Sequence, residues 1–166
     1  MRAFAVLACL LLMAACARTD PAASGPGAAA GDRPAAGTGA ATDYSPGTQA
    51  ALAAEAGDTV YFAFDSAVLR APSQRVLRQQ AAWLERNAGA RVIVEGHADE
   101  RGTRDYNLAL GARRAEAVRT FLVGLGIAPE RIETISYGEE RPAVAGSGEE
   151  AWARNRRAVT RIEAVS

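Results

Sequence analysis

The hydrophobic and polar positions divide the chain into three parts. Residues 3–15 form an apolar run that follows Arg2 and ends in small residues. Residues 17–57 are almost all Ala, Gly, Pro, Ser, Thr or Asp and show no apolar periodicity. From residue 58 onward, large apolar side chains recur at the spacings of strands and helices. We therefore expect one folded domain over 58–166, preceded by a disordered linker.

The folded part alternates predicted strands and helices. Its first strand is aromatic-rich and alternates large and small side chains, and Asn or Gly residues mark the helix ends. The pattern predicts strands over 60–65, 91–95, 131–137 and 159–165, and helices over 72–87, 105–123 and 149–155. Because strand–helix–strand units favour parallel pairing, the order β-α-β-α-β-(α)-β predicts an α/β fold. We expect an α+β sandwich with one mixed sheet and helices packed on one face.

Three finer predictions concern packing. The longest predicted helix should face the sheet with residues at helical spacing, namely Leu108, Ala112, Ala115, Val118 and Leu122. The strand over 131–137 should turn Ile132, Ile135 and Tyr137 partly inward, and Trp83 and Trp152 should lie in the core or cover helices. Alanines over 49–56 could form a helix, but such a short helix is marginal by itself, so disorder is expected up to about residue 57.

The N-terminal apolar run has the features of a secretory signal and is too short to span a bilayer. It ends in Leu12-Met13-Ala14-Ala15-Cys16, which resembles a bacterial lipoprotein signal, although the pattern prefers leucine where Met13 stands. The resemblance implies cleavage after residue 15 and lipidation of Cys16 with N-palmitoyl and S-diacylglycerol groups. Because the residue after this cysteine is Ala17 and not aspartate, the resemblance also implies export to the outer membrane. The alternative is that Cys16, like Cys9, is only an apolar residue of the signal.

Composition narrows the functional classes. All 19 positive residues are arginines, since lysine is absent, and 19 acidic residues bring the formal net charge to zero. This balance argues against nucleic-acid binding through phosphate neutralisation. The chain has two cysteines, and the expected cleavage and lipidation would leave no free thiol for a disulfide or a thiolate site.

The candidate chemistry centres on the polar loop after the strand at 91–95. Asp99 lies in this loop, and Asn107 and Arg114 lie seven positions apart on the next helix, two turns along one face. Helical side chains lean toward the helix N-terminus, so Arg114 should point back toward the loop, where unpaired N–H groups of the first turn also attract anions. Such a site could bind a ligand with one positive and one negative group. Two alternatives stay open: a plain Asp99–Arg114 salt bridge, and Arg113 in the role of Arg114.

Several segments resemble a known family. Residues 96–115 (GHADERGTRDYNLALGARRA), together with 61–66, 136–142 and 151–157, closely resemble the peptidoglycan-associated lipoproteins of the Tol–Pal system. Within the first segment, Asp99, Asn107, Leu110 and Arg113-Arg114-Ala115 resemble the wider signature of outer-membrane-protein-A-like domains. The likeness covers residue 59 to the C-terminus.

This resemblance implies non-covalent binding of peptidoglycan through the diaminopimelate of its stem peptide. Asp99 would bind the ammonium group of diaminopimelate and Arg114 its carboxylate, with the other contacts from Asn107, Thr103, Leu108, Asp65 and Phe64. Core packing remains an alternative for Phe64. Alanine at position 99 or 114 would weaken wall binding and leave the domain folded. The implied partners are the outer membrane and the periplasmic and inner-membrane Tol proteins, in drawing the outer membrane inward during cell division and in envelope integrity.

The rival class is a peptidoglycan hydrolase. His97 is the only histidine, so no zinc site can be completed, and we expect its ring to donate a hydrogen bond that orders the loop. Gly146-Ser147-Gly148 lacks the glycine that a nucleophile elbow needs two residues before the serine, and Asp99 and Glu100 are adjacent rather than facing each other across a sugar. We predict a binding protein without metal or cofactor. A similar lipoprotein that serves another envelope machine remains the second alternative.

Overall fold

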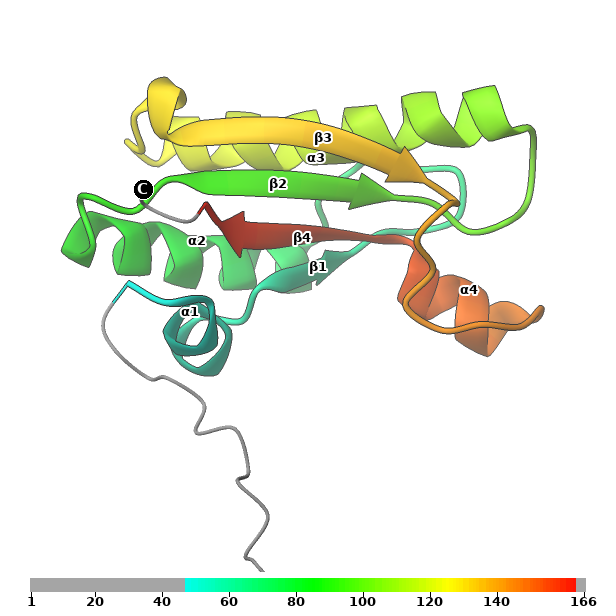
Figure 1. Cartoon of the computed structure of the whole chain (residues 1–166), viewed down its shortest axis with the longest axis horizontal. Helices are drawn as coiled ribbons and strands as arrows, with labels where there is room; N and C mark the ends of the chain where they lie inside the picture. Colours follow the sequence, from blue (N-terminus) through cyan, green and yellow to red (C-terminus); the bar gives the residue numbers. More distant parts are fainter. Residues whose placement is uncertain (1–46, 164–166) are drawn as a thin grey trace, which may run out of the picture. The chain divides into compact units, whose positions relative to one another are not determined.

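The computed structural model describes residues 47–163, so the predicted signal, Cys16 and most of the predicted linker lie outside the described residues. The elements follow the chain in this order: α1 (Gln49–Glu55), β1 (Thr59–Tyr61), α2 (Ala71–Arg86), β2 (Val92–His97), α3 (Arg104–Gly124), the 3-10 helix η1 (Pro129–Arg131), β3 (Ile132–Gly138), α4 (Glu149–Asn155) and β4 (Arg157–Ile162) (Figure 1). No helix in this part of the chain is both long and apolar enough to cross a membrane.

The four strands form one mixed sheet in the order β1-β4-β2-β3. β2 and β3, which α3 connects, are parallel, whereas β4 runs antiparallel to both β1 and β2. Helices α2 and α3 lie side by side along one face of the sheet (Figure 1). The predicted fold class is therefore confirmed.

The core lies between the sheet and these two helices. Val92 and Val94 of β2 point toward it, and Leu77 and Leu84 of α2 and Val118 of α3 are buried against them. Two local features start the helices: Pro72 occupies the first turn of α2, and the Thr103 hydroxyl caps α3 by accepting a hydrogen bond from the Tyr106 N–H. Trp83 belongs to this core, which is one of the two locations predicted for it.

The expectation of disorder up to residue 57 is wrong for residues 47–57. Helix α1 buries Ala51 and Leu52 in the core, and the Gln49 amide bonds to β4, donating to the Thr160 carbonyl at 3.2 Å and accepting from the Ile162 N–H at 2.8 Å. These contacts join positions 111 and 113 residues apart. A helix that is marginal in isolation is thus stabilised by tertiary packing, as most short helices in proteins are.

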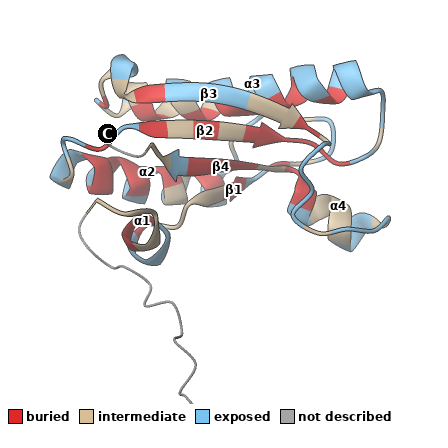
Figure 2. Cartoon of the chain, in the orientation of Figure 1, coloured by how far each residue is buried: buried red, intermediate tan, exposed pale blue. Residues whose placement is uncertain are grey.

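The predicted face of α3 is also wrong at its N-terminal end. Leu108 is 43% exposed and Ala112 is exposed, whereas Asn107, Leu110, Gly111 and Arg114 are buried; Ala115, Val118 and Leu122 are buried as predicted. The cause is that this end of the helix faces the sheet with polar and small residues, so counting apolar positions selects the wrong side. In β3, Ile132 is buried but Ile135 is 41% exposed. The middle of this strand is exposed (Figure 2).

Three strands have a boundary that differs from the prediction by two residues or more. β2 ends at His97, two residues after its predicted end. β1 ends at Tyr61, because the Phe62 N–H makes a last bond to the Arg156 carbonyl and the chain then turns, with Asp65 at φ +50°. β4 begins at Arg157, two residues before the predicted start, and residues 164–166 lie outside the described part.

Candidate functional site

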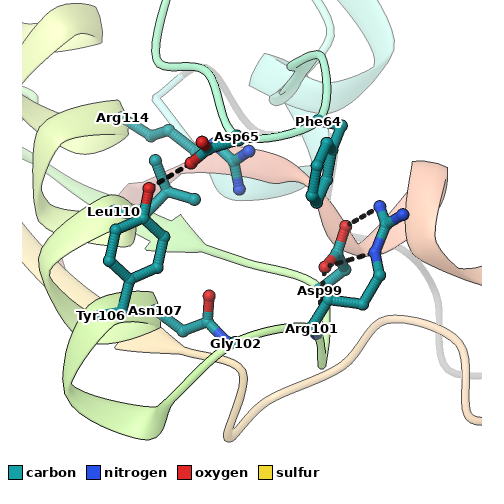
Figure 3. Close-up of a pocket in the computed structure, with 9 residues that line it drawn as sticks. All are labelled: Phe64, Asp65, Asp99, Arg101, Gly102, Tyr106, Asn107, Leu110 and Arg114. Carbon is teal, nitrogen blue, oxygen red and sulfur yellow. Dashed lines mark hydrogen bonds and ion pairs between the residues drawn. The ribbon is translucent and has the colours of Figure 1, made fainter.

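A pocket lies where the loop after β2, the first turns of α3 and the segment after β1 meet. It encloses about 170 Å³. Its lining residues are Phe64, Asp65, Asp99, Arg101, Gly102, Tyr106, Asn107, Leu110 and Arg114 (Figure 3). Five of the seven predicted site residues are therefore brought together here, from three separate segments of the chain.

Arg114 is fully buried and is held by three backbone carbonyls. Its Nε donates to Ser66 O at 2.9 Å, Nη1 to His97 O at 2.7 Å, and Nη2 to Ala63 O at 3.1 Å. A guanidinium has five N–H groups, so one N–H on each Nη remains for another acceptor. Burial lowers the pKa of Arg114 to about 10, and the side chain stays charged at neutral pH.

No ion pair within residues 47–163 includes Arg114. Asp99 pairs instead with Arg101 and Arg156, at 2.6 and 3.3 Å. The alternative of a plain Asp99–Arg114 salt bridge is therefore wrong. Arg113 is exposed, so the helix phase favours Arg114 as the pocket residue. Arg114 therefore forms a cationic wall of the pocket, and its remaining N–H groups can donate to a carboxylate.

Asp99 is the buried anion of the pocket, with 4% of its surface exposed. Its carboxylate accepts bonds from the Arg101 backbone N–H at 3.2 Å, from the Arg101 side chain at 3.2 and 2.6 Å, and from Arg156 Nη1 at 3.3 Å. Burial acts to raise the pKa of Asp99, but the hydrogen bonds from Arg101 and Arg156 outweigh it and hold the pKa below its usual range. Asp99 is therefore ionised at neutral pH.

The opposite wall comes from the segment after β1. Phe64 is 58% exposed and its ring contacts the Arg101 guanidinium, 4.0 Å from ring centroid to Cζ, so it lines the pocket and is not a core residue. Asp65 adopts a left-handed backbone conformation, which is uncommon outside glycine, and accepts a hydrogen bond from the Tyr106 hydroxyl (Figure 3). Asp65 thus adds a second carboxylate to the pocket.

Asn107 forms the floor between the two walls. It is buried, and its Nδ2 donates to the Glu139 carboxylate, which fixes the orientation of the amide. Its oxygen points into the pocket (Figure 3). Gly102 lies against the same amide, and its φ of +112° is a backbone conformation that favours glycine.

The structure does not bring Thr103 or Leu108 to the pocket. Thr103 caps α3, and Leu108 is exposed with its carbonyl accepting from Ser136 Oγ at 2.6 Å. The sequence reasoning missed four lining residues: Arg101, Gly102, Tyr106 and Leu110. Helical spacing could have found Leu110, which lies three positions after Asn107 and four before Arg114.

His97 does not order the loop through its ring, so that prediction is wrong. The ring is 2% exposed, neither nitrogen has a hydrogen-bond partner, and the Tyr137 ring lies 5.6 Å away. Burial, followed by the nearby charges of Arg157, Arg141 and Arg161, lowers the pKa of His97 to about 4. The ordering contact is made by the His97 backbone carbonyl, which accepts from Arg114. Within residues 47–163, no group of three His, Cys, Asp or Glu side chains could hold a metal ion.

Comparison with known proteins identifies the family. A model of the OmpA family matches residues 61–156, which include every residue of the pocket. The chain belongs to the OmpA family. Within this family it is similar to proteins named peptidoglycan-associated lipoprotein. The one from Mesorhizobium japonicum is 51% identical over 126 residues, which cover 76% of this chain and 73% of the relative. The one from Pseudomonas aeruginosa is 47% identical over 158 residues, covering 93% and 92%.

A solved structure agrees with this assignment to the OmpA family. The crystal structure of the peptidoglycan-associated lipoprotein from Burkholderia pseudomallei matches with a TM-score of 0.62 and 42% identity. The match covers 64% of this chain and 90% of that one. The resemblance seen in the sequence is therefore confirmed at the level of both family and fold.

Proposed function

We propose that this domain binds peptidoglycan non-covalently, by holding the zwitterionic end of a diaminopimelate side chain. The observation that carries the proposal is a buried arginine with two free N–H groups and no carboxylate partner within residues 47–163, facing the same pocket as an ionised aspartate. The names of the relatives, peptidoglycan-associated lipoproteins, support the same ligand.

The geometry suits an amino-acid terminus better than a sugar chain. A volume of about 170 Å³ is smaller than the roughly 300–1,000 Å³ typical of sites that enclose a whole small molecule. The ligand carboxylate would accept from the two free N–H groups of Arg114, and its ammonium would face Asp99 and Asp65. Each such charge-assisted hydrogen bond is worth about 1.5–3 kcal/mol.

Hydrolysis of the wall fits the site less well. A glycosidase needs a carboxylic acid with a raised pKa beside a second carboxylate. The pKa of Asp99 is shifted in the opposite direction, and its oxygens are occupied by Arg101 and Arg156. We therefore infer a binding role without catalysis.

Replacing Asp99 with Asn should weaken wall binding about tenfold or more, which corresponds to roughly 1.4 kcal/mol. The amide keeps the shape of the side chain but removes the charge that attracts the ammonium group. Co-sedimentation with purified sacculi, with free meso-diaminopimelate as competitor, measures the loss. Asp105→Asn is the matched control, because Asp105 is exposed in the first turn of α3 and does not line the pocket. Equal binding by Asp99→Asn and wild type would disprove the assignment, and release of muropeptides would favour a hydrolase.

The anchor is proposed to be a lipidated Cys16, which would place the domain on the periplasmic side of the outer membrane. The linker between Cys16 and the described residues, roughly 30 residues long, would span about 30 Å on average. Cys16→Ser should then shift the full-length protein from the membrane to the soluble fraction after cell lysis. Cys9→Ser, inside the predicted signal, should leave the protein in the membrane fraction. Retention of the Cys16→Ser protein in membranes would refute the lipid anchor.

The cellular role proposed from the family resemblance is in the Tol–Pal system, in outer-membrane invagination during division and in envelope integrity. Pull-down of the periplasmic and inner-membrane Tol proteins with the full-length protein tests it. If Tol proteins do not bind while sacculi do, the domain serves another envelope machine.

A further inference from the structure

Arg101 occupies an unusual position at the edge of the pocket. Its guanidinium is sandwiched between two aromatic rings, with Cζ 4.0 Å from the Phe64 centroid and 4.1 Å from the Trp152 centroid. Phe64 comes from the segment after β1 and Trp152 from α4, so elements at distant positions in the chain form this sandwich. Stacking on two aromatic faces fixes the plane of the guanidinium while leaving its edges free to bond.

One edge of Arg101 bonds Asp99, the anion proposed to receive the ammonium group of the ligand. Nη2 lies 2.6 Å from Asp99 Oδ2 and Nε 3.2 Å from Oδ1, and both residues line the pocket (Figure 3). Arg156, buried beside them, contacts Oδ2 at 3.3 Å. The free domain thus already holds a cation of its own on Asp99.

A second acid lies within reach of Arg101. Nη2 is 3.9 Å from Glu149 Oε2, on the first turn of α4. The Glu149 side chain is 66% exposed, and its other oxygen, Oε1, accepts from Arg156 Nη2 at 2.6 Å. Arg101 therefore stands between a buried carboxylate on the pocket side and an exposed one on the α4 side.

We propose that Arg101 is an internal substitute for the cationic group of the ligand. In the free domain it neutralises Asp99; when the ligand binds, the ammonium group takes its place and Arg101 moves toward Glu149. This inference rests on the proposed function. The exchange keeps Asp99 paired throughout, because Arg156 stays in place, and it avoids the large penalty of a buried unpaired charge.

The exchange makes Arg101 a determinant of both affinity and selectivity. Only the fraction of molecules in which Arg101 has left Asp99 can accept the ligand cation, so the apparent affinity is reduced by that fraction. A ligand without an ammonium group gains nothing in return for displacing Arg101. Such a ligand leaves Arg101 in place, so the exchange lowers the apparent affinity for zwitterions and not for plain carboxylates.

The test is Arg101→Met, which keeps an apolar chain between the rings and removes the competing charge. We expect the affinity for meso-diaminopimelate, measured by calorimetry, to rise at least about threefold. This is the factor in affinity that corresponds to the free energy of a weak ion pair. Arg104→Met is the matched control, since Arg104 is exposed, pairs with Glu140 and does not line the pocket. Unchanged or weaker binding by a folded Arg101→Met protein would overturn the exchange.

Glu149→Gln supplies an independent variant in which Arg101 itself is intact. Because Arg101 loses its second partner, we expect weaker binding, whereas Glu150→Gln, on the same turn but paired with Arg154, should not change it. Equal binding by Glu149→Gln and wild type would argue against the movement toward α4.

Trp152 gives a readout that does not depend on affinity. When diaminopimelate saturates the wild type, movement of the Arg101 guanidinium away from the Trp152 ring should change the fluorescence of Trp152. The change should be absent in Arg101→Met. The Trp152→Phe variant shows which part of the emission comes from Trp152 and which from the buried Trp83. Binding with no change in Trp152 emission and no gain in Arg101→Met would reject the exchange and leave the proposed function intact. If diaminopimelate does not bind wild type at all, the proposed function fails first.

Discussion

Arg114→Ala should destabilise the domain by about 3–5 kcal/mol, since each buried carbonyl left without a donor costs about 1–3 kcal/mol, and it should also abolish ligand binding. The side chain is fully buried, and its loss leaves the carbonyls of Ala63, Ser66 and His97 without their donor and opens a cavity beside them. Against the 5–15 kcal/mol typical of a whole domain, this is a large fraction. The expectation from sequence that the domain tolerates this change is therefore revised.

Urea denaturation of Arg114→Ala and wild type measures the loss. Arg113→Ala is the matched control, because the neighbouring arginine is exposed and its contact is with the Tyr106 ring at 5.6 Å. We expect it to change stability by no more than about 0.5 kcal/mol, as surface substitutions usually do. If Arg114→Ala unfolded at the same urea concentration as Arg113→Ala, the three carbonyl contacts would not be the support described here.

Gly96→Ala should be still more disruptive, because β2 and α3 touch through their backbones at this point. A Cβ atom on Gly96 would lie 1.9 Å from the Gly111 carbonyl oxygen and 2.6 Å from its carbon. Backbone atoms in the middle of a helix cannot move aside as a flexible side chain can. The helix must shift off the sheet, and we expect a cost above the roughly 1–3 kcal/mol of ordinary overpacking.

Thermal denaturation followed by circular dichroism checks this expectation. Gly124→Ala is the control: Gly124 ends α3, nothing lies within 4 Å of a Cβ placed there, and alanine in a helix should be neutral or slightly stabilising. A melting temperature of Gly96→Ala close to that of Gly124→Ala would mean that α3 and β2 are not in such close contact in solution.

The order of elements could be predicted because local signals mark it. Thr103 caps α3, Pro72 lies in the first turn of α2, and α4 was predicted with the bounds Glu149–Asn155 that the structure has. In each of these elements the local preference and the tertiary fold agree. The seven-residue spacing of Asn107 and Arg114 indicated that they share a helix face near Asp99, and all three line one pocket, although the spacing left a plain salt bridge and Arg113 as alternatives.

What could not be predicted depends on contacts between distant positions. Arg114 can be buried because carbonyls from residues 63, 66 and 97 accept its hydrogen bonds, and no pattern within α3 announces this. Helix α1 forms because Gln49 bonds the C-terminal end of β4 and Leu52 packs in the core. Arg101 lies between Phe64 and Trp152, which are 88 residues apart in the chain.

The three carbonyl contacts of Arg114 also have a mechanical meaning. A pull on a carboxylate held by this side chain would not load α3 alone, since the same guanidinium grips the end of β2 at His97 and the segment after β1 at Ala63 and Ser66. Tension is shared among three parts of the chain, through three bonds on the protein side against two N–H groups on the ligand side. Under tension, such a site should release the ligand before the contacts of Arg114 with the domain break.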